Sequence, residues 1–266
     1  MNDLEEVRFG VLRGVELARG SQDIRDALGS ETRARLFTQH FDHYFALFDN
    51  QHALDTYVLC LSEHDREDHD GMLSMWRGYG SNGGGAAIVL DTGKLRAVEG
   101  TPLIIAMVHY GSADERLAWL QGTLSKFARI IRELSLADEK LHLAAFALFD
   151  RIKIFSLFSK HRGFSEEREW RIVYVRDRDQ ENKLAPMFHY WIGPRGVEPK
   201  LRLKVAPIEG WTDEDLSLTK IVERIILGPS VSSPLAKASV LRMLDQLGKP
   251  SLKERVYAST IPFRPA

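Results

Sequence analysis

In the stretch Phe164-Ser165-Glu166-Glu167-Arg168-Glu169-Trp170-Arg171-Ile172-Val173-Tyr174-Val175, charged residues run directly into a strand-forming sequence. On a strand, side chains alternate between two faces, so Glu167, Glu169 and Arg171 are expected to share one face. Trp170, Ile172 and Tyr174 are expected to share the other, where they can enter the core. This pattern fits a functional site, and it equally fits a solvated sheet edge with cross-strand salt bridges.

The bulk composition is that of an ordinary soluble globular protein. The chain has 266 residues, of which 44% are hydrophobic and 27% charged, enough for one large domain or two small ones. Its formal net charge of −1 provides no global positive field to hold nucleic acid. The net charge therefore does not indicate a nucleic-acid partner, although local positive patches remain compatible with one.

The sequence predicts a cytoplasmic protein without a membrane partner. No segment approaches the roughly 18 apolar residues of a membrane span, and no signal peptide opens the chain. The single cysteine, Cys60, lies in the apolar run Tyr57–Leu61. It is expected to be a small core residue rather than a nucleophile, and one unpaired cysteine fits a reducing compartment.

Hydrophobic periodicity predicts a single α+β domain over residues 1–266, with a mixed or antiparallel sheet. Residues 103–110 are nearly all apolar and are expected to form a central strand. Residues 113–160 are expected to form a helical hairpin inserted into the domain. Helices are expected from Asn2 or Asp3, over 31–48, 113–134 and 138–158, and over 231–247. Strands are expected over 56–62, 86–91, 103–110, 170–175, 187–192, 201–205, 221–227 and 255–261.

Two further segments carry weak chemical signals. His64–Asp70 holds two histidines and four carboxylates, which invites a metal interpretation, but it lacks both calcium-loop spacing and an HExxH pattern. We interpret it as a solvated loop and expect no metal. The run Ser81-Asn82-Gly83-Gly84-Gly85 precedes a strand, whereas phosphate-binding glycine loops follow one. It indicates a tight connection rather than a nucleotide loop.

A Glu-x-Glu on a strand has two enzymatic uses. Glu167 and Glu169 could act as a carboxylate pair in glycoside chemistry. They could instead serve nicotinamide–ribose cleavage, in which a carboxylate polarises the ribose. Arg171 could bind a diphosphate bidentately, or it could simply neutralise the two glutamates.

The short helix expected around Met72–Gly80 could supply the rest of a pocket. Trp76 and Tyr79 offer stacking faces, and Arg77 offers a second phosphate ligand. Two aromatic residues at this spacing more often pack in the core or at its rim, and an arginine such as Arg77 is more often a solvated helix residue. The strand end at Ser62 is the third element that could meet at this pocket.

A set of motifs resembles domain of unknown function 2971, a bacterial family that includes proteins similar to the abortive-infection protein AbiGi. The resemblance extends over nearly the whole chain, and its specific parts are the tryptophan–tyrosine helix and the Glu-x-Glu-x-Arg strand. The motifs are Ser62, Met75–Gly80 with the glycine loop leading into Ile88–Asp91, Phe164–Arg171, Ile225–Pro229 and Ser259–Arg264.

The resemblance also implies a missing first strand. Members of the family usually start with a strand, followed by an Asn-Asp motif with a nearby glutamate, which Asn2, Asp3 and Glu6 resemble. Translation then starts further upstream, or the strand is dispensable, or another chain supplies it. The family's opening and its Glu-x-Glu are distantly similar to ADP-ribosyltransferase folds, in which the first strand helps to bind NAD.

The resemblance implies an NAD-consuming ADP-ribosyltransferase-like enzyme that modifies a target or hydrolyses NAD, with a role in phage defence or as a toxin. Glu169 is expected to be the catalytic glutamate and Glu167 to orient the acceptor. The expected NAD-binding residues are Trp76, Tyr79, Arg77, Arg171 and Ser62. The alternative is a non-catalytic sensor domain that binds a nucleotide or a protein partner. A third hypothesis is a metal-dependent nuclease that uses His64–Asp70.

Overall fold

The computed structural model describes residues 2–50, 55–95, 100–193, 196–231 and 233–263, with side chains from Val7 onward. The side chains of Asn2, Asp3, Glu6 and Arg264 lie outside these described residues. The chain folds into two compact units, residues 1–61 with 102–180 and residues 62–101 with 181–266. Each unit has its own hydrophobic core. The single domain expected over 1–266 is left as a prediction.

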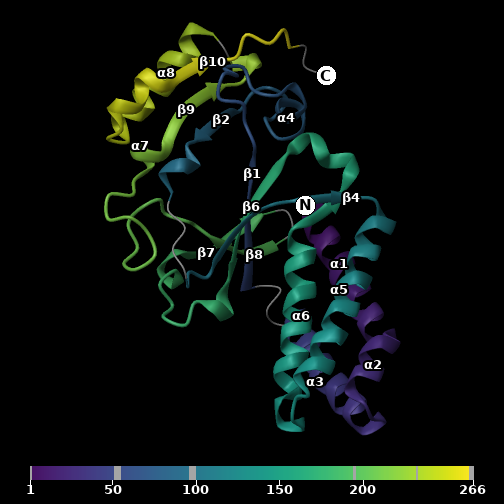
Figure 1. Cartoon of the computed structure of the whole chain (residues 1–266). Coiled ribbons are helices and arrows are strands. Elements are labelled where there is room, and N and C mark those ends of the chain that lie inside the picture. The colour runs from purple at the N-terminus through teal and green to yellow at the C-terminus, as the bar shows by residue number, and fades with distance from the viewer. Residues whose placement is uncertain (1, 51–54, 96–99, 194–195, 232, 264–266) are drawn as a thin grey trace. The chain divides into compact units, whose positions relative to one another are not determined.

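A bundle of helices forms much of the first unit (Figure 1). Helix α6 packs against α1 and α3, and α5 packs against α1 and α2. The two helices expected between 113 and 158 are confirmed, and they pack into a larger bundle with the N-terminal helices. The helices are α1 (Asn2–Gly20), α2 (Gln22–Leu28), α3 (Glu31–Asn50), α5 (Ala113–Leu134) and α6 (Leu141–Leu157).

Two glycines allow α1 to approach α6 closely. A Cβ atom added to Gly10 would lie 2.7 Å from Ser156 Oγ, and one added to Gly14 would overlap the Ile152 side chain. Glycine at both positions therefore lets the α1 backbone approach the Ser156 and Ile152 side chains more closely than a Cβ would permit. The close approach buries Ile152 to 1% exposure and anchors the C-terminal half of α6.

The first unit also contains a three-stranded sheet in the order β1-β6-β3. Its strands are β1 (Thr56–Ser62), β3 (Leu103–Met107) and β6 (Glu169–Val175). Strands β3 and β6 are antiparallel, with Met107 opposite Trp170. The expectation that residues 103–110 form a central strand is wrong, because β6 is central and β3 lies at an edge of the described sheet. Ile105 and Met107 are each 51% exposed there.

Two short parallel strands connect the helices of the first unit to its sheet. Strand β4 (His109–Gly111) pairs with β5 (Ser159–His161), and this pairing sets Tyr110 opposite Lys160. Strand β4 continues from β3 after a break at Val108, and β5 follows directly after α6. This pair of strands therefore ties the end of α6 to the end of β3.

The second unit is built on a sheet in the order β10-β9-β2. Strand β9 pairs antiparallel with β2 and parallel with β10, so the sheet is mixed as expected. Strands β7 and β8 form a separate antiparallel hairpin, in which β8 starts at Gly196 rather than at the expected Leu201. The elements are α4 (Leu73–Gly78), β2 (Ala86–Leu90), β7 (Phe188–Gly193), β8 (Gly196–Leu201), α7 (Leu218–Ile221), β9 (Val222–Leu227), α8 (Pro234–Gln246) and β10 (Val256–Ala258).

The α+β class is confirmed by these helices and small sheets. None of the described helices is long and apolar enough to cross a membrane.

The glycine run at residues 83–85 serves backbone packing within the second unit. Gly228 N–H donates to Gly85 O at 2.8 Å, and Ser230 N–H donates to Gly83 O at 3.0 Å. Gly83 has φ of 81°, a conformation that glycine adopts without strain. The run is thus a tight connection, as the sequence predicts, and its carbonyl groups are used by the turn after β9.

Replacing Gly228 with alanine tests this packing. The new Cβ would overlap the carbonyl oxygen of Gly83 and lie 2.9 Å from that of Gly85, and neither backbone atom can swing aside like a side-chain tip. We expect Gly228→Ala to lower the free energy of unfolding by about 1–3 kcal/mol in urea denaturation. Gly78→Ala is the matched control, because nothing lies within 4 Å of its added Cβ. Equal stability of the two variants would contradict this account.

Candidate functional site

The Glu-x-Glu lies at the entrance to β6 rather than within a regular strand. Strand β6 starts at Glu169, and Glu167 ends the preceding 3-10 turn, Arg162–Glu167. Arg168 between them has φ of 40°, in the left-handed region. The prediction that Glu167, Glu169 and Arg171 share one strand face is therefore wrong for Glu167. The turn nevertheless brings its carboxylate to the same lysine that Glu169 contacts.

The face of β6 that carries the charges is the buried one. Glu169 is 3% exposed and Arg171 0%, whereas Trp170 is 38% exposed. The prediction that Trp170, Ile172 and Tyr174 face the core is wrong for Trp170 and confirmed for Tyr174, which is 2% exposed, while Ile172 is half-buried. Val173 and Val175 enter the helical core, and the two-residue period of a strand then turns Arg171 and Glu169 to the same side.

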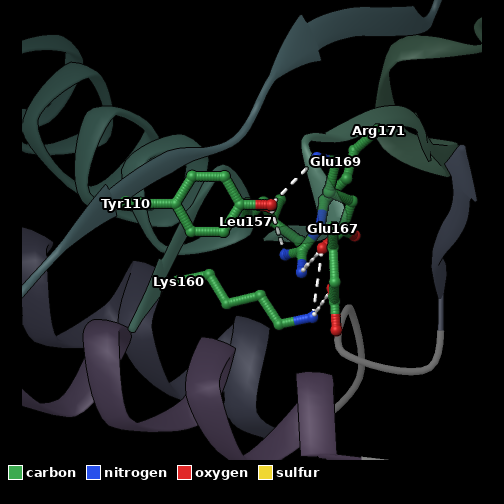
Figure 2. Close-up of polar contacts among 6 residues, drawn as sticks. All are labelled: Tyr110, Leu157, Lys160, Glu167, Glu169 and Arg171. Atoms are coloured by element: carbon green, nitrogen blue, oxygen red, sulfur yellow. Dashed lines mark hydrogen bonds and ion pairs between the residues drawn. The ribbon is translucent and has the colours of Figure 1, made fainter. Parts of the chain in front are cut away.

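Four charged side chains form a closed network at this buried face (Figure 2). Arg171 Nε donates to Glu169 Oε1 at 2.7 Å, and Arg171 Nη2 to Glu169 Oε2 at 3.3 Å. Lys160 Nζ lies 3.1 Å from Glu169 Oε2 and 2.7 Å from Glu167 Oε2. Two cations thus balance two carboxylates, as burial of charge requires.

Backbone groups complete the network. Arg171 Nη1 donates to the carbonyl of Leu157 at 2.7 Å, at the last residue of α6. Carbonyl groups at a helix C-terminus lack intrahelical donors and carry partial negative charge, so a guanidinium is favoured there. The Tyr110 hydroxyl accepts the backbone N–H of Glu169 at 2.9 Å. The helix end, β4 and β6 are therefore joined at one point.

Sequence reasoning missed Lys160 and Tyr110 as members of this site. Lys160 belongs to none of the predicted motifs, yet it is 3% exposed and bonded to both glutamates. Both residues reach the site because the parallel β4–β5 register sets them side by side. No sequence pattern signals that register, since each of these strands is only three residues long.

The network sets the ionisation of its buried groups. Burial raises the pKa of Glu169, but hydrogen bonds from Arg171, Cys60 and Lys160 outweigh it and leave the pKa below its ordinary value. Burial also raises the pKa of Tyr110, with the negative charges of Glu169 and Glu167 adding to the effect. Glu169 is therefore ionised and Tyr110 protonated at neutral pH.

Cys60 differs from its prediction. It is exposed rather than a core residue. Its strand, β1, neighbours β6 in the sheet, and its thiol hydrogen-bonds to Glu169. Cys60 thus contributes to the polar environment of the carboxylate.

The other predicted site residues belong to the second unit. Trp76 in α4 is 4% exposed, and its indole N–H donates to Asp70 O at 2.8 Å. Arg77 is exposed, Tyr79 is 65% exposed, and Ser62 ends β1. The predicted pocket between α4 and Glu169 would include residues of both units, so it remains a prediction.

The His64–Asp70 segment is an ordered loop held by its own hydrogen bonds. The His64 ring contacts Asp68 O at 2.8 Å, and Asp68 Oδ1 accepts the N–H groups of Asp70 and Gly71. Arg224 donates to the carbonyls of Arg66 and Asp68. Within the described part of the chain, no three His, Cys, Asp or Glu side chains converge as metal ligands would.

The structure therefore defines an α+β protein with a buried, charge-balanced Glu-x-Glu at the entrance to a central strand. Residues 75–172 match the family model described as "Protein of unknown function (DUF2971)". The match supports the predicted resemblance to this family over that segment, which contains every predicted site residue except Ser62. The motifs at 225–229 and 259–264 lie outside the match. No curated protein and no solved structure is significantly similar to the chain.

Neutralising Glu169 tests whether the network holds the first unit together. Glu169→Gln leaves Arg171 and Lys160 buried without a full counter-charge, so we expect a loss of about 3–5 kcal/mol in the free energy of unfolding. The control is Glu16→Gln, which removes a solvent-exposed ion pair between Arg13 and Glu16 and should cost less than about 1 kcal/mol. Similar losses for the two variants would show that the network contributes no more than a surface pair.

The pH dependence of stability gives an independent check. Because the pKa of Glu169 is lower in the folded state, its stabilising effect is complete well above the ordinary value of 4.5 and is lost as the pH falls through the folded pKa. We expect the free energy of unfolding to decrease below pH 4.5, and to decrease less in Glu169→Gln. Urea unfolding at stepped acidic pH measures this. Identical pH slopes in both proteins would rule out the effect.

Proposed function

We propose that the protein consumes NAD in the manner of an ADP-ribosyltransferase, either modifying a target or hydrolysing NAD. The observation that carries the proposal is the Glu-x-Glu at the entrance to the central strand β6, with one carboxylate buried and the other partly open. The side chain of Glu167 is 14% exposed and that of Glu169 4%. Paired carboxylates at one site but in different environments suit a division of roles.

The geometry favours Glu167 as the carboxylate that contacts substrate. In NAD cleavage, the bond between ribose C1′ and nicotinamide breaks, and the electron pair leaves with nicotinamide. A carboxylate stabilises the positive charge that develops on the ribose, and water or an acceptor hydroxyl then bonds to C1′ and loses a proton. Of the two carboxylates, Glu167 is the more accessible for this role.

Glu169 is better suited to positioning. Both of its oxygens bond to Arg171 or Lys160, and its negative charge is already balanced. By holding Lys160 in place, Glu169 also fixes the ion pair that orients Glu167. Arg171 is similarly engaged with Glu169 and Leu157 and is 0% exposed, which disfavours the phosphate-binding role expected from the sequence.

We expect Glu167→Gln to lower the rate of NAD turnover at least about 100-fold. The glutamine amide keeps the shape of the carboxylate but not its negative charge. Free nicotinamide and labelled acceptor are measured with the full chain. Glu166→Gln is the matched control, since Glu166 is the adjacent exposed glutamate in the same turn. It should keep wild-type turnover.

Wild-type protein that releases no nicotinamide and labels no acceptor would refute the proposal. If turnover occurs, bacterial growth on expression of wild type and of Glu167→Gln tests the toxin role inferred from the family resemblance. Growth arrest by both proteins would separate toxicity from the chemistry.

The second candidate function is a non-catalytic sensor that binds a nucleotide. It is favoured by the closed network, in which Glu169, Lys160 and Arg171 have the burial and pairing of a structural element. Thermal stabilisation by NAD or ADP-ribose without turnover would support this candidate over the enzyme.

A further inference from the structure

The hydroxyl group of Tyr110 lies at the Glu-x-Glu site, where it accepts a hydrogen bond from the protein but donates none to the described residues. Its hydroxyl oxygen accepts the Glu169 N–H at 2.9 Å, and the residue is partly exposed. A phenol has one proton to donate as well as lone pairs to accept with. Among the described residues, no acceptor takes the proton of Tyr110.

The groups around this hydroxyl define the kind of ligand that would suit it. Tyr110 is paired with Lys160 in the β4–β5 register, and Lys160 is bonded to Glu167 (Figure 2). The charges of the four side chains in the network cancel. A charge-balanced site with one hydroxyl donor and one partly open carboxylate acceptor does not select a free anion. It suits a neutral polyol, whose neighbouring hydroxyl groups can accept one hydrogen bond and donate another.

We propose that Tyr110 is a ligand-contacting residue of this site and donates its proton to a hydroxyl of a ribose ring, while Glu167 accepts from the neighbouring hydroxyl. The assignment of that ribose to NAD rests on the proposed function, but recognition of the ribose requires no turnover. Burial of the phenol raises its pKa, with the charges of Glu169 and Glu167 adding to the effect, and keeps it protonated, which a donor needs. The fixed contact with the Glu169 backbone orients the hydroxyl before a ligand arrives.

The test compares ADP-ribose with ADP, which lacks the distal ribose, as ligands of the full chain. Wild type should bind ADP-ribose more tightly than ADP in calorimetry. In Tyr110→Phe the affinity for ADP-ribose should fall about three- to tenfold, the range of one lost hydrogen bond, while the affinity for ADP is unchanged. Tyr190→Phe, at a 68% exposed tyrosine of the second unit, is the control and should match wild type.

The outcomes separate this inference from the proposed function. Loss of the ADP-ribose preference in Tyr110→Phe supports the inference even where NAD is not turned over. A wild type without that preference, or a Tyr110→Phe variant that keeps it, overturns the inference even where NAD is turned over.

A second measurement needs no variant, because loss of the Glu169 contact could impair folding of Tyr110→Phe. Nitration of wild-type tyrosines, mapped by mass spectrometry, should show Tyr110 protected by ADP-ribose and not by ADP. Equal nitration of Tyr110 with both ligands would overturn the inference.

Discussion

The buried pair of Glu169 and Arg171 constrains much of the first unit, since a guanidinium with 0% exposure must find all its partners inside the protein. Its partners include the Glu169 carboxylate and the last carbonyl of α6. The strand entrance and the helix end are thereby fixed to each other. Lys160 extends the same constraint to Glu167, so the turn before β6 is anchored as well.

Such a network is a costly way to join two elements. Charges leave water at a large desolvation penalty, which good pairing only offsets, and an apolar cluster of equal volume is often as stable. A network of this kind specifies geometry, because its hydrogen bonds are directional whereas apolar contacts are not. It sets one carboxylate inside and leaves the other partly open, an arrangement that fits a site better than a sheet edge.

The segment that matches the family model does not coincide with either of the two compact units. Residues 75–172 include α4 from the second unit and the whole Glu-x-Glu region from the first. Two elements of the matched segment are explained by packing alone: Trp76 is buried with its indole N–H bonded, and the glycine run supplies carbonyls to the turn after β9. The Glu-x-Glu network is the part of the segment in which charged rather than apolar groups join the elements.

Residue patterning alone was enough to locate most elements and the segment that holds the candidate site. Periodicity located the helices at 113–134 and 138–158, and the concentration of charge before Trp170 marked the strand that proved central. It could not determine which face of β6 is buried, because alternation fixes only that two faces exist. The tertiary structure decided that Val173 and Val175 meet the helices, and so carried Glu169 and Arg171 inward. Lys160 and Tyr110 joined the site only through strand pairing across 50 residues of chain, as their parallel register shows. Local sequence carries no record of such contacts, since they depend on how separated segments pack.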